Sequence, residues 1–288
     1  MLDSHQRRIE RKRAPPNLIE RRRDGRHSHA SIVMLTGYNG AVQFLATLLL
    51  AAAVLCTALQ AQALQELPVV CPPPDAEALG LTCSEDDPCP VFLELQSVEA
   101  SGPSVYVTGN LHTVNVTLAG VLLESDDTGK TWTEPAKRLR AAALEQIQFV
   151  DFQHGWAAGV MLEPLPKDPF LLLTTDGGRS WRKAPLFEET DYGSIQQFWF
   201  ESPTSGELVL DRSQGGAKRF ELYASMTGGA SWELREKSDR PIALPKVKSP
   251  DSGNWRIRAD GESYRVERRT VQGWETTARF ATHAGECK

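Results

Sequence analysis

The stretch SDDTGKTW, residues 125–132, recurs twice along the chain, as TTDGGRSW at 174–181 and SMTGGASW at 225–232. The three copies align without gaps on the pattern Ser/Thr-x-Asp-x-Gly-x-Ser/Thr-Trp, with Thr227 replacing the Asp in the third. Their tryptophans are 49 and 51 residues apart. A repeat of about 40 to 50 residues in a strand-rich chain predicts the blades of a β-propeller.

The flanks of each copy repeat as well. An apolar strand precedes each one, as in GVLLES, FLLLTT and FELYAS, and an alternating run lies further upstream, as in IQFVDFQHGWAAG (147–159). Residues 245–280 form a fourth, degenerate unit that keeps Trp255 and Trp274 but lacks the Asp and Gly. Short alternating strands between Gly, Pro, Ser and Asp turns predict an all-β fold. We expect a β-propeller-like array of about four four-stranded blades.

The repeated segments, called boxes below, are interpreted as scaffold turns. The Asp carboxylate can accept bonds from backbone N–H groups just ahead of it, Gly supplies a positive φ, and Trp packs on the sheet. A phosphate-binding reading of Gly-Lys-Thr fails because position 124 is Glu and a strand, not a helix, should follow. The structural box residues are Ser125, Asp127, Gly129, Trp132, Thr174, Asp176, Gly178, Trp181, Ser225, Gly229 and Trp232.

The box pattern resembles the Asp-box, also called the bacterial neuraminidase repeat. With the preceding F-x-D-x-x-x-G-W-A-x-G segment, from Phe149 to Gly159, it looks like the photosystem II stability and assembly factor family over residues 91–280. That resemblance implies a non-catalytic propeller that helps to assemble a membrane complex. The family has seven blades and this chain has four units, so the sequence leaves open closure into one ring or pairing of two chains as a homodimer.

The N-terminal residues have the layout of a secretory signal. Residues 1–33 form a basic leader, and residues 34–63 contain an apolar run that ends in Ala61-Gln62-Ala63, so we expect cleavage after Ala63. The alternative is a membrane anchor at 41–59, and translation from Met34 instead of Met1 would shorten the leader. A Cys- and Pro-rich segment (64–90) then precedes the propeller-like domain (91–288). We expect an exported protein, periplasmic or extracellular.

Four cysteines follow the signal, and an even number in an exported chain predicts two disulfides. Cys71, Cys83 and Cys89 precede the first blade, so one of them should pair with Cys287 and the other two with each other. Pairing Cys83 with Cys89 closes a small loop, and pairing Cys71 with Cys287 joins the two ends of the domain.

Charge excludes one class of partner. The chain has a net charge of −5, and the basic residues of the leader leave the exported part still more acidic. Nucleic acid is therefore excluded as a partner. We expect the membrane to be contacted only through an uncleaved N-terminal segment, and we expect no cofactor and no metal site.

Two function classes remain, a binding module and an enzyme. A resemblance to sialidases would make the chain a glycoside hydrolase or a carbohydrate-binding protein. It would imply an F-R-I-P strand, three arginines that hold a carboxylate and a Tyr-Glu nucleophile pair, and the sequence shows none of these patterns. We therefore expect that the chain is not an enzyme. The binding reading expects a protein or peptide of the envelope as partner. Its candidate residues lie in loops and links opposite the boxes: Lys137, Arg138, Arg140, Arg212, Lys218 and Arg219.

Overall fold

The computed structural model describes residues 63–69, 71, 77–163, 168–187, 192–212, 219–244 and 253–288. Residues 61–288 form one compact unit. The predictions for the leader, the apolar run and the start codon lie outside the described residues. Within the described part of the chain, no helix is long and apolar enough to span a bilayer.

The fold is all-β, as the alternating strands predict, and its strands form four sheets that we call A to D. Sheet A comes from the two ends of the unit. Its order is β1-β16-β15-β14, and β1 pairs with β16 in parallel. Its strands are β14 (Trp255–Asp260), β15 (Ser263–Thr270), β16 (Gly273–Ala281) and β1 (Leu64–Gln65).

Sheet B holds the first box and both the earliest and the latest strands of the unit. The last strand of the chain, β17, pairs antiparallel with β2 and gives this sheet five strands. The strands are β17 (His283–Cys287), β2 (Cys89–Ser101), β3 (Ser104–His112), β4 (Thr117–Ser125) and β5 (Leu139–Arg140).

Sheets C and D are regular four-stranded antiparallel meanders, each with a box between its third and fourth strands. Sheet C contains β6 (Ala142–Phe149), β7 (Gly155–Met161), β8 (Asp168–Thr174) and β9 (Arg182–Pro185). Sheet D contains β10 (Ser194–Phe200), β11 (Gly206–Asp211), β12 (Phe220–Ser225) and β13 (Glu233–Ser238).

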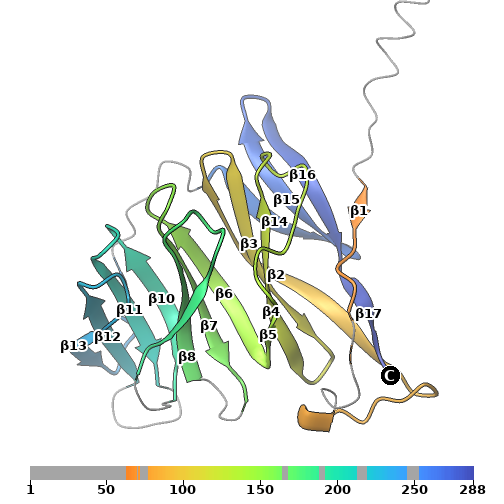
Figure 1. Ribbon diagram of the computed structural model, residues 1–288, viewed down its shortest axis with the longest axis horizontal. Coiled ribbons are helices and arrows are strands. Elements are labelled where there is room, and N and C mark those ends of the chain that lie inside the picture. Colours follow the sequence, from red (N-terminus) through yellow and green to blue (C-terminus); the bar gives the residue numbers. More distant parts are fainter. Residues whose placement is uncertain are drawn as a thin grey trace, which may run out of the picture. The chain divides into compact units, whose positions relative to one another are not determined.

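The sheets pack face to face in the order A, B, C, D (Figure 1). Alternation along the strands puts one apolar set on each face. One core cluster joins A to B, a second joins B to C, and a third joins C to D. Among the described residues, no core cluster contains side chains of both A and D. The row of four sheets therefore has two terminal faces, one on A and one on D.

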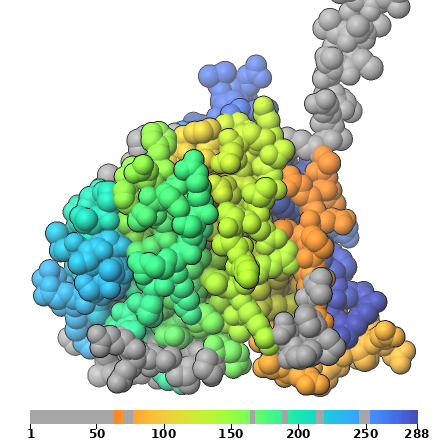
Figure 2. All heavy atoms as spheres, in the orientation of Figure 1, coloured from red at the N-terminus to blue at the C-terminus, as the bar shows by residue number. Residues whose placement is uncertain are grey.

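The N-terminal segment is more integrated than the predicted boundary at residue 90 implies. Strand β1 completes sheet A, and β2 already begins at Cys89. The residues of this segment that pack on the A–B core are Leu67, Val69, Cys71, Leu79 and Leu81. Figure 2 shows this segment in orange beside the yellow-green strands of sheet B.

Two disulfides hold this arrangement. Cys71 is bonded to Cys287, 216 residues later, and Cys83 is bonded to Cys89. Among the pairings that the sequence left open, the structure thus selects Cys71 as the partner of the C-terminal cysteine. That bond fastens the segment before the first blade to β17 and hence to sheet B.

Candidate functional site

The first box is a turn built around one carboxylate. Asp127 Oδ1 accepts hydrogen bonds from the backbone N–H groups of Lys130 (3.0 Å) and Thr131 (2.8 Å), and Oδ2 accepts from Thr131 Oγ1 (2.9 Å). Ser125 Oγ donates to Asp127 and accepts from Gly129 N at 2.8 Å. These bonds, with that from Thr131 N foremost, lower the pKa of Asp127 to about 2.

The other two boxes repeat this geometry. Asp176 accepts from Ser180 through both its oxygens, at 3.0 and 2.6 Å, and Thr227 Oγ1 takes the same place in the third box by accepting from Ser231 N at 2.9 Å. The second box glycine needs its φ of 85° and has no room for a side chain. A Cβ at Gly178 would lie 2.6 Å from the ring of Tyr106.

The three box tryptophans are half-buried, and each packs against one of the core clusters between sheets. Trp181 meets Phe149 edge-on at 5.9 Å between ring centroids. Trp132 and Trp232 meet Phe280 and Phe200 in the same edge-on manner. Among the described residues, the buried Nε1 atoms of Trp181 and Trp232 have no hydrogen-bond partner, whereas Trp132 Nε1 donates to the Gly129 carbonyl at 3.0 Å.

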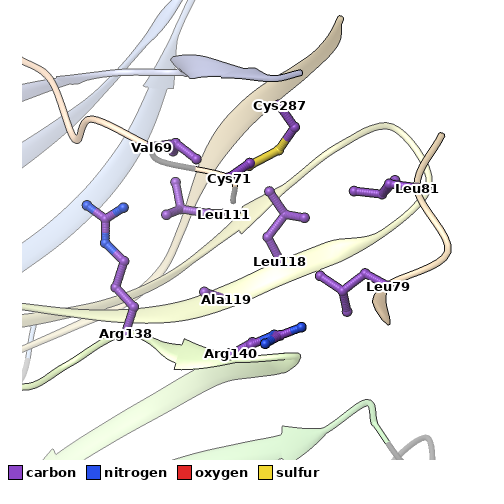
Figure 3. A pocket seen from close by; sticks show the side chains of 10 residues that line it. All are labelled: Val69, Cys71, Leu79, Leu81, Leu111, Leu118, Ala119, Arg138, Arg140 and Cys287. Atoms are coloured by element: carbon purple, nitrogen blue, oxygen red, sulfur yellow. A yellow bond between two sulfur atoms is a disulfide. The ribbon is translucent and has the colours of Figure 1, made fainter. Parts of the chain in front are cut away.

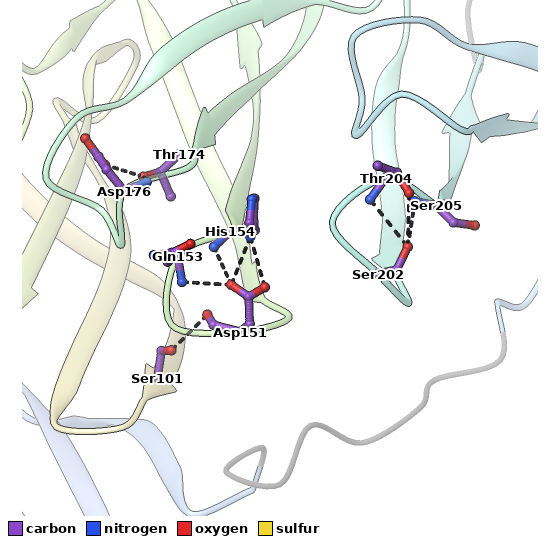
Figure 4. Close-up of polar contacts among 9 residues, drawn as sticks. All are labelled: Ser101, Asp151, Gln153, His154, Thr174, Asp176, Ser202, Thr204 and Ser205. Atoms are coloured by element: carbon purple, nitrogen blue, oxygen red, sulfur yellow. Dashed lines mark hydrogen bonds and ion pairs between the residues drawn. The ribbon is translucent and has the colours of Figure 1, made fainter.

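A second repeated element is the hairpin between the first two strands of sheets C and D, drawn in Figure 4. In sheet C, Asp151 Oδ1 accepts from Gln153 N and His154 N, both at 2.7 Å, and in sheet D Ser202 Oγ accepts from Ser205 N at 2.9 Å. The glycine that follows is required: a Cβ at Gly155 would lie 2.6 Å from the ring of Phe149. The F-x-D-x-x-x-G segment is thus a hairpin, and its Gln153 carbonyl accepts a hydrogen bond from Gly177 N of the second box at 2.9 Å.

The box reading makes a testable prediction at Asp176. Asp176→Ala should cost about 1 kcal/mol at pH 7, as loss of a capping carboxylate does. The bonds from Ser180 lower the pKa of Asp176 in the folded state. Its stabilisation is therefore complete above the unfolded value, about 4, and is lost as pH falls through the folded value. Urea unfolding from pH 7 to pH 2 measures both effects.

Thr227→Ala is the matched control, because Thr227 holds the same turn without titrating. Its cost should stay constant with pH. If Asp176→Ala costs nothing at pH 7, or if its cost does not shrink in acid, Asp176 does not act as a charged cap.

At the opposite end of sheet B lies a cavity of about 200 Å³ (Figure 3). Its floor combines the ends of β3 and β4 with the N-terminal segment and the C-terminal disulfide. Leu111, Leu118 and Cys287 are buried there. The apolar part of the lining is Val69, Cys71, Leu79, Leu81, Leu111, Leu118, Ala119 and Cys287.

Two arginines from the link after the first box line the same cavity. Arg138 donates twice to the carboxylate of Glu134, at 2.9 and 2.8 Å, and once to the carbonyl oxygen of Pro68 at 2.9 Å. Three of its five N–H groups are used in these bonds. The guanidinium is thereby fixed near Val69, and Arg140 lines the cavity below Ala119 (Figure 3).

The predicted basic residues therefore divide into two groups. Arg138 and Arg140 both line the cavity, and Lys137, the residue before Arg138, is exposed. Arg212 and Arg219 lie on sheet D, where they form ion pairs with Glu221 and Asp211. Lys218 lies outside the described residues. The apolar floor was not among the predicted site residues, because it is assembled from segments more than 200 residues apart.

A second hollow, of about 580 Å³, lies between sheets B and C at the box end and is polar. Burial raises the pKa of Glu124 there, while the bonds from Ser180 lower the pKa of Asp176. Two neighbouring carboxyl groups whose pKa values are shifted in opposite directions are a pattern found in glycoside hydrolases. Asp176, however, uses both its oxygens within its own turn. Among the described residues, no group of His, Cys, Asp and Glu could hold a metal ion.

No protein-family model matches the chain, and no curated protein matches it. Among solved structures, the chain is similar to YCF48 bound to D1 peptide, with 22% identity and a TM-score of 0.36, over 66% of this chain and 56% of that chain. YCF48 from Cyanidioschyzon merolae matches at 19% identity and a TM-score of 0.36, over 66% and 57%. The GH74 xyloglucanase from Xanthomonas campestris matches at 18% and 0.36, over 64% and 28%. The chain thus spans little more than half the length of the YCF48 chains, and these likenesses concern the fold alone.

Proposed function

We propose that this chain is an exported, non-catalytic binding module of the propeller class, and that its cavity on sheet B binds an acidic peptide segment through one apolar side chain. Its natural target would be a protein of the envelope, whose assembly or stability it would support. In this proposal the three boxes are Asp-boxes with a structural role. The two disulfides support export, because such bonds persist in oxidising compartments.

The observation that carries the proposal is an apolar floor beside a fixed guanidinium. The leucines of the floor, Leu79, Leu81, Leu111 and Leu118, offer an apolar side chain a site away from water. Arg138 is already oriented by Glu134 and the Pro68 carbonyl, so binding a carboxylate would cost little ordering of its side chain. Arg138 is ion-paired with Glu134, and Arg140 adds another guanidinium to the lining of the same cavity.

The test uses fluorescein-labelled peptides and fluorescence anisotropy with the full-length chain. The probe is Gly-Asp-Leu-Glu-Leu-Gly, and the matched peptides replace both acids with Lys or both leucines with Ala. We expect the probe to bind roughly tenfold more tightly than either matched peptide, because each lacks one half of the recognition. Arg140→Ala should weaken binding of the probe by a similar factor.

Arg182→Ala is the control, since Arg182 is an exposed arginine of β9 outside the cavity. Leu118→Asp tests the floor by introducing a charge among the leucines. Equal affinity for all three peptides, or equal loss in Arg140→Ala and Arg182→Ala, would contradict the proposed site.

A further inference from the structure

The terminal face of sheet A is a plane of arginines. Register pairs Arg256 with Glu267, Arg258 with Arg265, and Arg265 with Arg279, so these residues share the face opposite the A–B core. The five arginines of this face are Arg256, Arg258, Arg265, Arg269 and Arg279.

Only two carboxylates balance these arginines within the described sheet. Glu267 pairs with Arg256 at 2.6 Å, and Asp260 pairs with Arg279 at 2.8 Å. Arg258 and Arg269 are exposed and form no ion pair among the described residues. Trp274, 38% exposed, lies under the guanidinium of Arg256 at 4.0 Å. Sheet A thus ends the row with a positive, partly aromatic face.

The terminal face of sheet D has the opposite charge. It carries Glu207, Asp211, Glu233 and Glu236, and Glu201 lies in the adjoining loop. Two arginines accompany them, and Arg219 and Arg235 pair with Asp211 and Glu233. A hollow of about 310 Å³ lies on this face, lined by Trp199, Glu201, Glu207 and Arg235 among others.

The equivalent position on sheet C is covered by the next sheet, D. The hairpins of C and D align without a gap, so Trp199 and Glu207 correspond to Gln148 and Trp156. On sheet C, Gln148 exchanges two hydrogen bonds with the backbone of Phe200, at 2.7 and 2.8 Å. Trp156 stacks on Phe200 at 3.8 Å and donates to the Gly228 carbonyl at 2.9 Å. Those residues of sheet C dock the next sheet.

Sheet D retains half of this docking surface. Gln197, the counterpart of Gln146, donates to the carbonyl oxygen of Ile242, and Leu244 packs on Val209 and Phe220. A short segment thus covers the end of the face away from the boxes. At the box end, the hollow is open, and Trp199 Nε1 has no hydrogen-bond partner among the described residues. On sheet D, Glu207 occupies the position of Trp156. It can accept a hydrogen bond, whereas Trp156 donates one.

We propose that the terminal face of sheet D binds the terminal face of sheet A in a second copy of this chain. The contact would extend the C–D type of interface by one more sheet, with arginines of A entering the acidic hollow beside Trp199. Like faces would repel each other, so charge selects the head-to-tail pairing. Two such contacts, related by a two-fold axis, can close a ring of two chains, because A of each copy then meets D of the other.

The test is a charge-swap experiment on the full-length chain, read by sedimentation velocity over a range of concentrations. Glu207→Arg changes only face D, and Arg258→Glu changes only face A. Alone, either variant should associate at least roughly tenfold more weakly than the wild type, because each juxtaposes like charges. Mixed in equal amounts, the two variants should associate nearly as tightly as the wild type, since both contacts in the mixed pair are then complementary.

Asp86→Arg is the control, because Asp86 is exposed in the loop of the small disulfide and the substitution makes the same change of charge as Glu207→Arg. Glu236→Arg and Arg269→Glu repeat the swap at exposed positions if either first variant unfolds. A wild type that stays monomeric overturns the proposal, as do single variants that associate like Asp86→Arg.

Discussion

Replacing Cys71 and Cys287 together with alanine should lower the free energy of unfolding by about 5 kcal/mol. The bond closes a loop with a sequence separation of 216, and the chain-entropy model assigns about that value to so long a loop. For a unit of this size each kcal/mol corresponds to roughly 2 to 4 °C in Tm. Thermal unfolding without reductant should therefore begin about 10 to 20 °C lower.

The short disulfide supplies the control. Cys83 and Cys89 are six residues apart, and the same model gives about 2 kcal/mol for so small a loop. The double alanine variant at 83 and 89 should thus lose much less stability. Equal losses in the two double variants would mean that loop length is not what makes the long bond stabilising.

The long bond also links stability to the proposed binding site. Cys71 and Cys287 both line the cavity, and Cys287 is fully buried. Without the bond, the cavity-lining residues Val69, Leu79 and Leu81 would lose the covalent link between their segment and β17. The peptide probe should therefore bind more weakly to the 71/287 variant than to the 83/89 variant even at temperatures where both are folded.

The repeats and strand periodicity predict the all-β fold because box, hairpin and strand are local, each written in about ten consecutive residues. The fifth strand of sheet B is not local, and neither is the pairing of β1 with β16. Both join residues near one end of the unit to residues near the other. Their short strands carry little pattern of their own, so the sequence placed residues 64–90 outside the domain.

Only part of the candidate site could likewise be predicted from the sequence. Arg138 and Arg140 could be named from the sequence because they lie in a link between two repeats. The floor could not be, because Leu79, Leu111 and Cys287 come from three separate parts of the chain. The charge of the terminal faces was also hidden, since alternate residues on three paired strands must first be assigned to one face. The signal for sheet D was nevertheless present: Glu207 stands where the preceding repeat has Trp156.

Trp156→Ala should cost about 3 to 5 kcal/mol, the range for a large aromatic removed from a core. Trp156 is 2% exposed, and its ring lies nearly parallel to that of Phe200, with a 3° angle between the planes. Removing the indole leaves a cavity between sheets C and D, and the Gly228 carbonyl loses the donor of its hydrogen bond. Urea unfolding of the full-length chain measures the loss.

Trp156→Phe separates the two contributions, because phenylalanine keeps a ring against Phe200 but cannot donate to Gly228. Its cost should be nearer the 1 to 3 kcal/mol of an unsatisfied buried acceptor together with some lost packing. Trp274→Ala, at an exposed tryptophan of sheet A, should cost under about 1 kcal/mol. If Trp156→Ala were no more harmful than Trp274→Ala, the stack would not hold sheets C and D together, and the docking surface inferred for sheet D would lose its template.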